Sequence, residues 1–303
     1  MAKDTTQQGI VLMLVFCLLA PLLDVSAKLA AENGVPVGQV TAARFLVQTM
    51  VMLPVMLAMG LELRLSPRAL AWSTLRALFL LLSTYAFVSG IEVMPIADAL
   101  AIVFVEPFIL LLLGPLIFGD KVGPRRIAAC AVGFLGALFV IQPSLAAFGL
   151  VALWPLATAF LFAFYMLVTR AMSTWMHPVA MQFQTSWIGL AMCLPVMVLA
   201  EGTGIVGLDP VWPTGWNWLW LFGVGFWAAV SHMAITYALK YAPSATLAPL
   251  HYSEIVVAVA LGYLIFADFP NPLTWAGIVV ICGSGLYIIH RERLAARVLA
   301  KAP

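Results

Sequence analysis

Apolar segments of about 20 residues, long enough as helices to cross about 30 Å of hydrocarbon, recur along almost the whole chain. Apolar residues make up 64% of the sequence and charged residues 9%, against roughly half and roughly a quarter in soluble domains. A soluble core therefore does not account for this composition. We expect an all-α integral membrane protein embedded in the lipid bilayer.

Breaks rich in Gly, Pro, Asn and charge separate these segments. They predict ten transmembrane helices, at residues 9–31, 38–60, 69–91, 96–118, 126–143, 149–170, 179–200, 217–239, 244–266 and 273–290. The first apolar run is too long for a cleaved signal peptide and lacks a clear cleavage site, so it is expected to remain as a helix.

The second half of the sequence repeats the first without a gap. At a shift of 148 positions, two acids and two prolines of the first half meet identical residues: Pro95 and Pro243, Glu106 and Glu254, Asp120 and Asp268, and Pro124 and Pro272. Matches among Leu, Ile and Ala carry little weight in so apolar a chain, whereas these four coincidences do. We therefore predict two related halves, residues 1–145 and 146–303.

The basic residues predict how the helices are oriented. Cytoplasmic loops of membrane proteins carry an excess of Lys and Arg. With both termini in the cytoplasm, thirteen of the fifteen basic residues fall on the inner side, and only Lys28 and Arg44 lie toward the outside. Because each half has an odd number of helices, five, the halves must face in opposite directions. This inverted arrangement is typical of transporters whose substrate site lies between the repeats.

Ionisable residues inside the membrane are costly and mark candidate sites. Asp24 and Lys28 lie four residues apart, on one face of the first helix. They form either a self-neutralising pair with Lys28 reaching the outer surface, or a charged pair that meets a zwitterionic ligand at the mouth of a cavity.

Glu106 and Glu254 lie in the middle of the fourth and ninth predicted helices. Each is either a structural group that joins helices or caps a broken backbone, or a carboxylate that binds a proton or an ammonium group. His251 precedes Glu254 by three residues, and a His–carboxylate contact can hold or pass a proton.

Further candidates are polar or aromatic residues that could line a central cavity with flat walls. The candidate binding residues in addition to those above are Tyr85, Ser89, Phe104, Tyr165, Trp227, His232 and Tyr252. Three prolines beside these groups, Pro21, Pro107 and Pro249, are candidate hinges because each removes a backbone hydrogen bond.

Two five-helix halves, the paired glutamates and the endings Phe118-Gly119-Asp120 and Phe266-Ala267-Asp268 together resemble the EamA type of the drug/metabolite transporter superfamily. Over its whole length the chain is most similar to the YddG branch of aromatic amino acid exporters. Many superfamily members have Glu where this chain has Asp120 and Asp268. The resemblance implies a bacterial inner-membrane exporter of neutral or aromatic amino acids and related amphipathic compounds, working by alternating access through a central cavity.

Several other functions are weaker interpretations. A multidrug, metabolite or lipid carrier of the same fold is the main alternative, and a channel lacks a filter-like loop. A membrane enzyme would need a convergent catalytic set, and none is evident in the sequence. We expect no cofactor, no metal and no nucleic-acid partner, because the four cysteines, Cys17, Cys130, Cys193 and Cys282, lie unpaired in apolar segments. The oligomeric state does not follow from the sequence.

Overall fold

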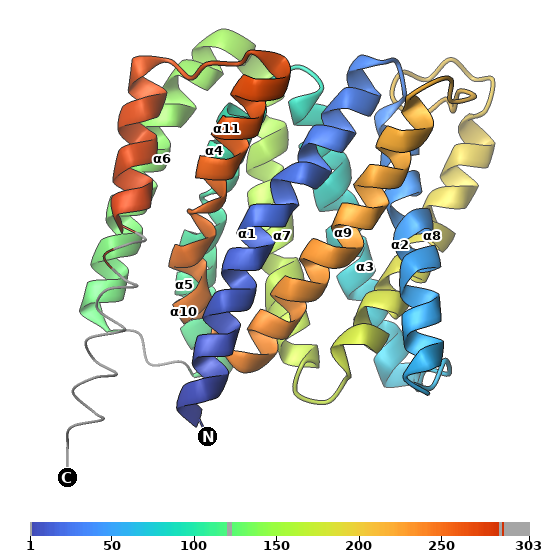
Figure 1. Cartoon of the computed structure of the whole chain (residues 1–303), viewed down its shortest axis with the longest axis horizontal. Coiled ribbons are helices and arrows are strands. Elements are labelled where there is room, and N and C mark those ends of the chain that lie inside the picture. The colour runs from blue at the N-terminus through green and yellow to red at the C-terminus, as the bar shows by residue number, and fades with distance from the viewer. Residues whose placement is uncertain (1, 120–122, 285–286, 288–303) are drawn as a thin grey trace.

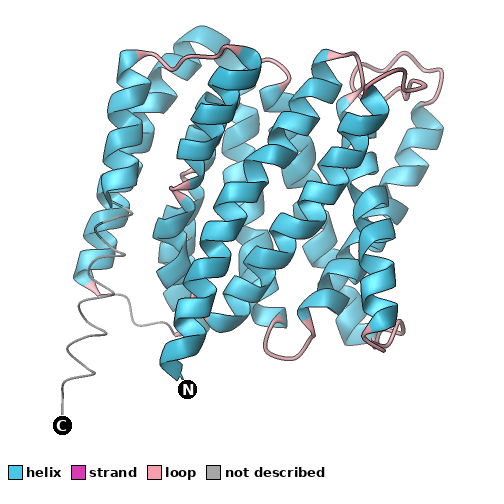
Figure 2. Cartoon of the chain, in the orientation of Figure 1, coloured by secondary structure: helices cyan, strands magenta, loops and turns pink. Residues whose placement is uncertain are grey.

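A computed structural model describes residues 2–119, 123–284 and 287 of the chain (Figure 1). In that part of the chain every regular element is a helix, as expected (Figure 2). The elements are α1 (Ala2–Glu32), α2 (Val37–Ala58), α3 (Pro67–Ile91), α4 (Ile96–Val103), α5 (Glu106–Phe118), α6 (Pro124–Phe148), the 3-10 turn η1 (Gly149–Ala152), α7 (Leu153–Met172), α8 (Pro178–Ala200), α9 (Asn217–Tyr241), α10 (Ser244–His251), α11 (Glu254–Phe266) and a further helix, Pro272–Ser284.

Seven helical stretches in the described residues are long and apolar enough to cross a membrane. One of them is the 46-residue run Ile127–Met172, because α6, η1 and α7 follow one another without an extended linker. Gly149, at φ +57°, makes the reversal between α6 and α7. Two shorter apolar helices, α11 and Pro272–Ser284, complete the set. The all-helical, membrane-type prediction is therefore confirmed.

The predicted continuous helices at 96–118 and 244–266 are wrong in one respect, since each is broken in the middle. The first divides at Phe104–Val105 into α4 and α5, and the second at Tyr252–Ser253 into α10 and α11. Pro107 lies in the first turn of α5, where its missing N–H would have no intrahelical partner anyway. It therefore begins a helix and does not kink one.

The two broken helices lie side by side and run in opposite directions. Figure 1 shows α4 above α5 but α10 below α11, and α10 packs on α5 while α11 packs on α4. The residues at the two breaks, Phe104 and Tyr252, touch edge to face at a ring distance of 5.4 Å. They are 148 positions apart, so two residues that the repeat matches contact each other at the helix breaks.

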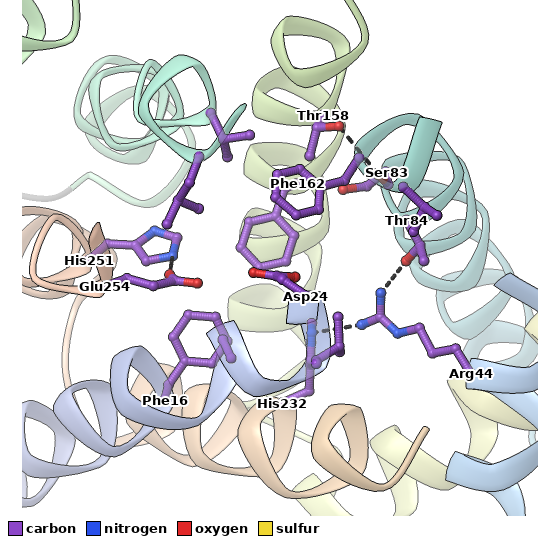
Figure 3. Close-up of a pocket in the computed structure, with 16 residues that line it drawn as sticks. Phe16, Asp24, Arg44, Ser83, Thr84, Thr158, Phe162, His232, His251 and Glu254 are labelled. Atoms are coloured by element: carbon purple, nitrogen blue, oxygen red, sulfur yellow. Dashed lines mark hydrogen bonds and ion pairs between the residues drawn. The ribbon is translucent and has the colours of Figure 1, made fainter. Parts of the chain in front are cut away.

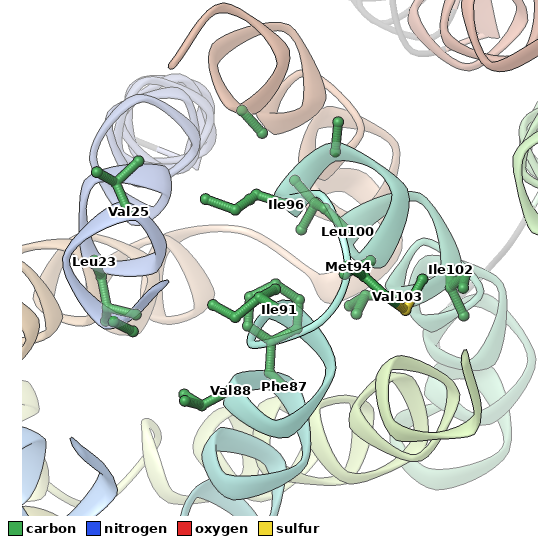
Figure 4. Close-up of a cluster of buried hydrophobic side chains, with 14 of the residues drawn as sticks. Leu23, Val25, Phe87, Val88, Ile91, Met94, Ile96, Leu100, Ile102 and Val103 are labelled. Atoms are coloured by element: carbon green, nitrogen blue, oxygen red, sulfur yellow. The ribbon is translucent and has the colours of Figure 1, made fainter. Parts of the chain in front are cut away.

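The longer helices pack around these breaks. α1 lies against α9, α3 against α7 and α2 against α8. Small residues allow close approach: a Cβ on Gly225 of α9 would lie 2.4 Å from Cβ of Val47 on α2. Beside the breaks, α1, α3 and α4 contribute an apolar cluster (Figure 4), whose labelled members are Leu23, Val25, Phe87, Val88, Ile91, Met94, Ile96, Leu100, Ile102 and Val103.

Candidate functional site

A cavity of about 80 Å³ lies among the helices, next to both breaks (Figure 3). It is lined by side chains from α1, α2, α3, α4, α7, α9, α10 and α11. The lining residues are Phe16, Ala20, Leu23, Asp24, Arg44, Ser83, Thr84, Phe87, Val88, Leu100, Val103, Thr158, Phe162, His232, His251 and Glu254. Because helices distant in sequence all contribute to it, the cavity depends on the whole bundle.

At one wall lie His251 and Glu254, with Glu106 directly behind them. We call these three residues the carboxylate cluster. His251 Nδ1 lies 2.8 Å from Glu106 Oε2, and His251 Nε2 lies 2.9 Å from Glu254 Oε2. All three side chains are at least 96% buried. Both ring nitrogens therefore face carboxylate oxygens, one from each broken helix.

The helix ends favour these charges. Glu106 and Glu254 are the first residues of α5 and α11, where the helix dipole stabilises negative charge. His251 is the last residue of α10, where the dipole stabilises positive charge. The breaks thus bring together the N-terminal ends of α5 and α11 and the C-terminal end of α10. Each helix end carries a residue whose charge its dipole favours.

The opposite wall is cationic. Arg44 Nη1 donates to Thr84 Oγ1, and Arg44 Nη2 lies 2.7 Å from His232 Nε2. A guanidinium only donates, so His232 Nε2 accepts and its Nδ1 carries the hydrogen. That Nδ1 lies 3.1 Å from the hydroxyl of Tyr165. His232 is thereby held in one tautomer between Arg44 and Tyr165.

A second arginine, Arg76, extends this network away from the cavity. It is fully buried, and its Nη2 donates to the Tyr165 hydroxyl at 2.7 Å. Its remaining donors reach oxygen atoms on α7, α8 and α9: those of Thr169, Met181, Gln182, Thr185 and Thr236. We call Arg44, Arg76, Tyr165 and His232 the arginine cluster. In the part of the chain described, neither arginine forms an ion pair with a carboxylate.

Aromatic rings and Asp24 fill the space between the two walls (Figure 3). Phe16 lies 5.9 Å from the ring of His232 and 5.4 Å from that of His251. Phe162 lies 5.9 Å and 6.0 Å from the same two rings. The Asp24 carboxylate points into the cavity between them. The cavity therefore has an acidic end, a basic end and flat apolar sides.

Four of the predicted site residues line this cavity: Asp24, His232, His251 and Glu254. Glu106 and Tyr165 stand behind it, each in contact with one of the lining histidines. Phe104 and Tyr252 lie at the helix breaks, and the Phe104 ring is 6.1 Å from that of His251. The sequence therefore identified all of the carboxylate cluster and half of the arginine cluster.

Three other candidates lie away from the cavity. Tyr85 packs edge to face on Trp154, and Ser89 donates to the Tyr85 carbonyl oxygen. Trp227 packs against Phe226. Of the candidate hinges, Pro21 lies inside α1, Pro107 begins α5, and Pro249 lies within α10, where its side chain is outside the described set.

The expected pair of Asp24 and Lys28 is not what the structure shows. Lys28 Nζ donates to the Met94 carbonyl oxygen at 2.8 Å and lies 3.5 Å from Asp268 Oδ2 and 3.7 Å from Glu32 Oε1. Side chains on a helix tilt toward its N-terminus, which would point Lys28 toward Asp24. The flexible Lys28 chain instead reaches Asp268, just after α11. Lys28 joins α1 to neighbouring elements and leaves Asp24 to the cavity.

Arg44 and Arg76 were not among the predicted site residues. The sequence pattern predicts the orientation of the helices from them, with Arg76 on the inner side and Arg44 toward the outside. Arg76 in fact lies inside the bundle, with none of its surface exposed. The signal was present, because an ionisable residue flanked by apolar residues within a membrane helix marks a site by default. Phe16 and Phe162 carried no such signal among many similar aromatics.

One family model matches the chain twice, at residues 7–142 and 149–290, and that family is described as the EamA-like transporter family. A riboflavin transporter of Vibrio cholerae serotype O1 is 25% identical over 300 residues, covering 97% of both chains. A riboflavin transporter of Rhizobium johnstonii is 30% identical over 220 residues, covering 72% of this chain and 69% of that one.

More distant similarities agree with this. An S-adenosylmethionine uptake transporter of Rickettsia felis is 24% identical over 259 residues, covering 85% of this chain and 84% of the other. A solved crystal structure superposes with a TM-score of 0.73 over 98% of this chain and 99% of its own, at 19% identity, and supports the fold alone. The YddG branch is not shown by these similarities.

Proposed function

The chain belongs to the EamA-like transporter family, and we propose that it carries a flat, polar organic metabolite across the membrane, with riboflavin as the first candidate. The family and the transporter-named relatives indicate a transporter and not an enzyme. A relative that is similar over 97% of both chains bears the name riboflavin transporter. A ring system with hydrogen-bonding edges is the chemistry that such a cavity suits.

The observation that carries this proposal is the arrangement of the cavity walls. Phe16 and Phe162 supply apolar faces for a flat ring system, while Arg44 and Glu254 supply a donor and an acceptor at opposite ends. Ligand sites of this kind combine apolar walls with a few placed polar groups. A flavin presents carbonyl oxygens at one edge of its ring system, which suit the Arg44 donor, and hydroxyl groups on its side chain, which suit an acceptor such as Glu254.

The volume of the cavity supports alternating access. Ligand pockets measure roughly 300–1,000 Å³, whereas this cavity holds about 80 Å³. Cargo therefore requires the surrounding helices to move apart. We propose that two inverted five-helix halves, 1–145 and 146–303, rock about the cavity, with Pro21, Pro249 and the helix break just before Pro107 as hinges. The antiparallel broken helices and the two matches of one family model support this arrangement.

A zwitterionic amino acid is the second candidate, and one observation favours it. Asp24 and Arg44 carry opposite charges at the same cavity, as recognition of an ammonium and a carboxylate would require. Under this second candidate, the protein exports neutral or aromatic amino acids, and both the cargo and the direction are to be tested. A multidrug or lipid carrier would instead show broad or lipid-selective movement. In either case we propose a bacterial inner-membrane location with both termini cytoplasmic.

Counterflow in proteoliposomes tests the proposal. Vesicles preloaded with unlabelled riboflavin should take up labelled riboflavin faster than empty-membrane controls, with saturation. Parallel assays with S-adenosylmethionine, phenylalanine, tryptophan, threonine and methionine identify the cargo class. Saturable phenylalanine or tryptophan exchange without riboflavin exchange would replace the first candidate by the second. Absence of saturable exchange for all six compounds would refute the proposed function.

A further inference from the structure

We propose that Glu106, His251 and Glu254 form a proton site shared between the two broken helices, through which proton movement is coupled to cargo movement. The inference rests on the proposed transport function and assigns its energy source. It stands on the geometry of the carboxylate cluster and on its position at the cavity wall.

First, the carboxylate cluster can hold different numbers of protons. Each ring nitrogen of His251 lies within 3 Å of a carboxylate oxygen. If both nitrogens carry hydrogen, the imidazolium serves both carboxylates and the cluster has a net charge of −1. One additional proton, taken by a carboxylate, makes it neutral. The cluster therefore has two stable loadings that differ by a single proton.

The second step is access to water. His251 and Glu254 line the cavity, whereas Glu106 is fully buried behind them. A proton that enters from the cavity reaches Glu254 or His251 first and Glu106 only through the His251 ring. Glu106 Oε1 has no hydrogen-bond partner among the described atoms, so it is available to take that proton. Access to the cluster thus follows access to the cavity.

The third step is the mechanical link. Glu106 belongs to α5, whereas His251 and Glu254 flank the break between α10 and α11. An imidazolium between two carboxylates holds these elements together. Protonation of Glu106 at Oε1 neutralises one of the two carboxylates and so weakens its contact with the His251 ring. The loading of the cluster therefore changes the attraction between segments from the two halves of the sequence.

Other titratable or charged groups surround the cluster. α1 brings Cys17, whose Sγ lies 3.9 Å from the His251 carbonyl oxygen, and Asp24. α9 brings His232, α7 brings Tyr165 and α2 brings Arg44, all within the arginine cluster on the opposite wall. Tyr165 and Arg44 fix His232 in one tautomer, so the acidic groups of this region that can change their proton content are Asp24 and the carboxylates of the cluster. In the part of the chain described, only those of the cluster pair with His251.

Two flux measurements on the same proteoliposomes test the coupling. Counterflow, which needs no driving force, reports transport itself. Accumulation under an imposed gradient of 1 pH unit, with the membrane potential clamped, reports coupling, and one proton per cargo supports up to about tenfold accumulation. The wild-type protein should show both activities with the cargo that gives saturable exchange.

The variant Glu106→Gln, at a carboxylate behind the cavity lining, should keep counterflow within about threefold and lose the accumulation caused by the pH gradient. Asp98→Asn removes a carboxylate in the first turn of α4, outside the cluster and the cavity, and should keep both activities. Glu106→Asp keeps the titratable group and should recover part of the accumulation. Thermal unfolding of each purified variant in detergent reports whether the fold is intact.

The outcomes separate the two proposals. Wild-type counterflow without any gradient-driven accumulation would overturn proton coupling and leave the transport function standing. Equal loss of both activities in Glu106→Gln, with folded protein, would assign the cluster a structural role and overturn the inference. Absence of counterflow in the wild type would refute transport itself, and the coupling with it.

Discussion

The two broken helices, α4–α5 and α10–α11, have the same backbone plan but different chemistry. In each, an eight-residue helix is followed by a two-residue break and a 13-residue helix that begins with Glu and ends with Phe. The residue before the break differs: the second pair has His251 where the first has Val103. The difference shows that the repeat supplies two matched carboxylates, and that a single substitution in one copy joins them.

The ends of the two pairs differ as well. α5 and α11 both finish in a left-handed residue, Gly119 at φ +68° and Ala267 at φ +58°. The first pair has Pro107 next to its glutamate, where the second has Ile255. The backbone conformation is therefore the same with and without the residues that favour it locally, which indicates that packing between the pairs maintains it.

The largest effect on stability is expected where the two breaks touch. Phe104 and Tyr252 are fully buried, so Phe104→Ala or Tyr252→Ala should each lower the free energy of unfolding by about 3–5 kcal/mol. Because the rings meet edge to face, a double-mutant cycle should show a coupling of about 0.5–1.5 kcal/mol. Equilibrium unfolding in mixed micelles measures both quantities. Phe222→Ala, at a half-exposed ring, is the control, and strictly additive losses would contradict the shared contact.

The second-largest effect is expected on cargo binding at the basic end of the cavity, where Arg44 lies. Arg44→Gln should weaken cargo binding by about 1.5–3 kcal/mol, the value of hydrogen bonds to a charged group. The half-saturation concentration in counterflow should rise ten- to hundredfold. Arg44→Lys keeps the charge but not the forked geometry and should fall in between. An unchanged half-saturation concentration in Arg44→Gln would remove this residue from the binding site.

A smaller effect is expected at the two left-handed helix ends. A residue with a Cβ pays about 1–2 kcal/mol in this conformation, and glycine avoids the cost. Ala267→Gly should therefore raise the free energy of unfolding by about 1 kcal/mol, and Gly119→Ala should lower it by a similar amount. The same unfolding assay measures both variants. Shifts of the same sign in both would show that the two ends are not equivalent.

The smallest effect is expected at Pro107. The second pair breaks at the same place with Ile255, so Pro107→Ala should leave the break intact and cost less than about 1 kcal/mol of stability. Hydrogen–deuterium exchange across residues 104–108 should match that of the wild type. Strong new protection there would mean that α4 and α5 had fused, and that proline alone made the break.

Much of the helical framework could be predicted from the sequence. Apolar length and breaker residues located most helix ends to within a few residues, because a segment in lipid must satisfy its backbone hydrogen bonds internally. The exceptions are α1, which begins at Ala2 and not near residue 9, and α6, which ends at Phe148 and not near residue 143. The predicted end at residue 290 lies outside the described residues. The repeat also marked Glu106 and Glu254 as a pair. The breaks beside them were missed, because Tyr252–Ser253 contains neither Gly nor Pro and its residues are compatible with a continuous helix.

Some contacts of the charged residues could likewise be predicted from the sequence, and others could not. Helical spacing placed His251 beside Glu254, a local relation that a sequence shows directly. The partners of Lys28, Arg44 and Arg76 are 40 or more positions away for every contact described above except Glu32, and spacing says nothing about those. A long, flexible side chain selects its partner according to which helices pack nearby.

The sequence by itself determined the membrane environment, the helical class and the existence of two matched acids, because hydropathy and repetition are properties of the chain order. Only the tertiary structure decided that the two acids meet at one histidine and that an arginine faces them across a small cavity. The physical reason is that antiparallel packing of two broken helices joins positions about 150 residues apart.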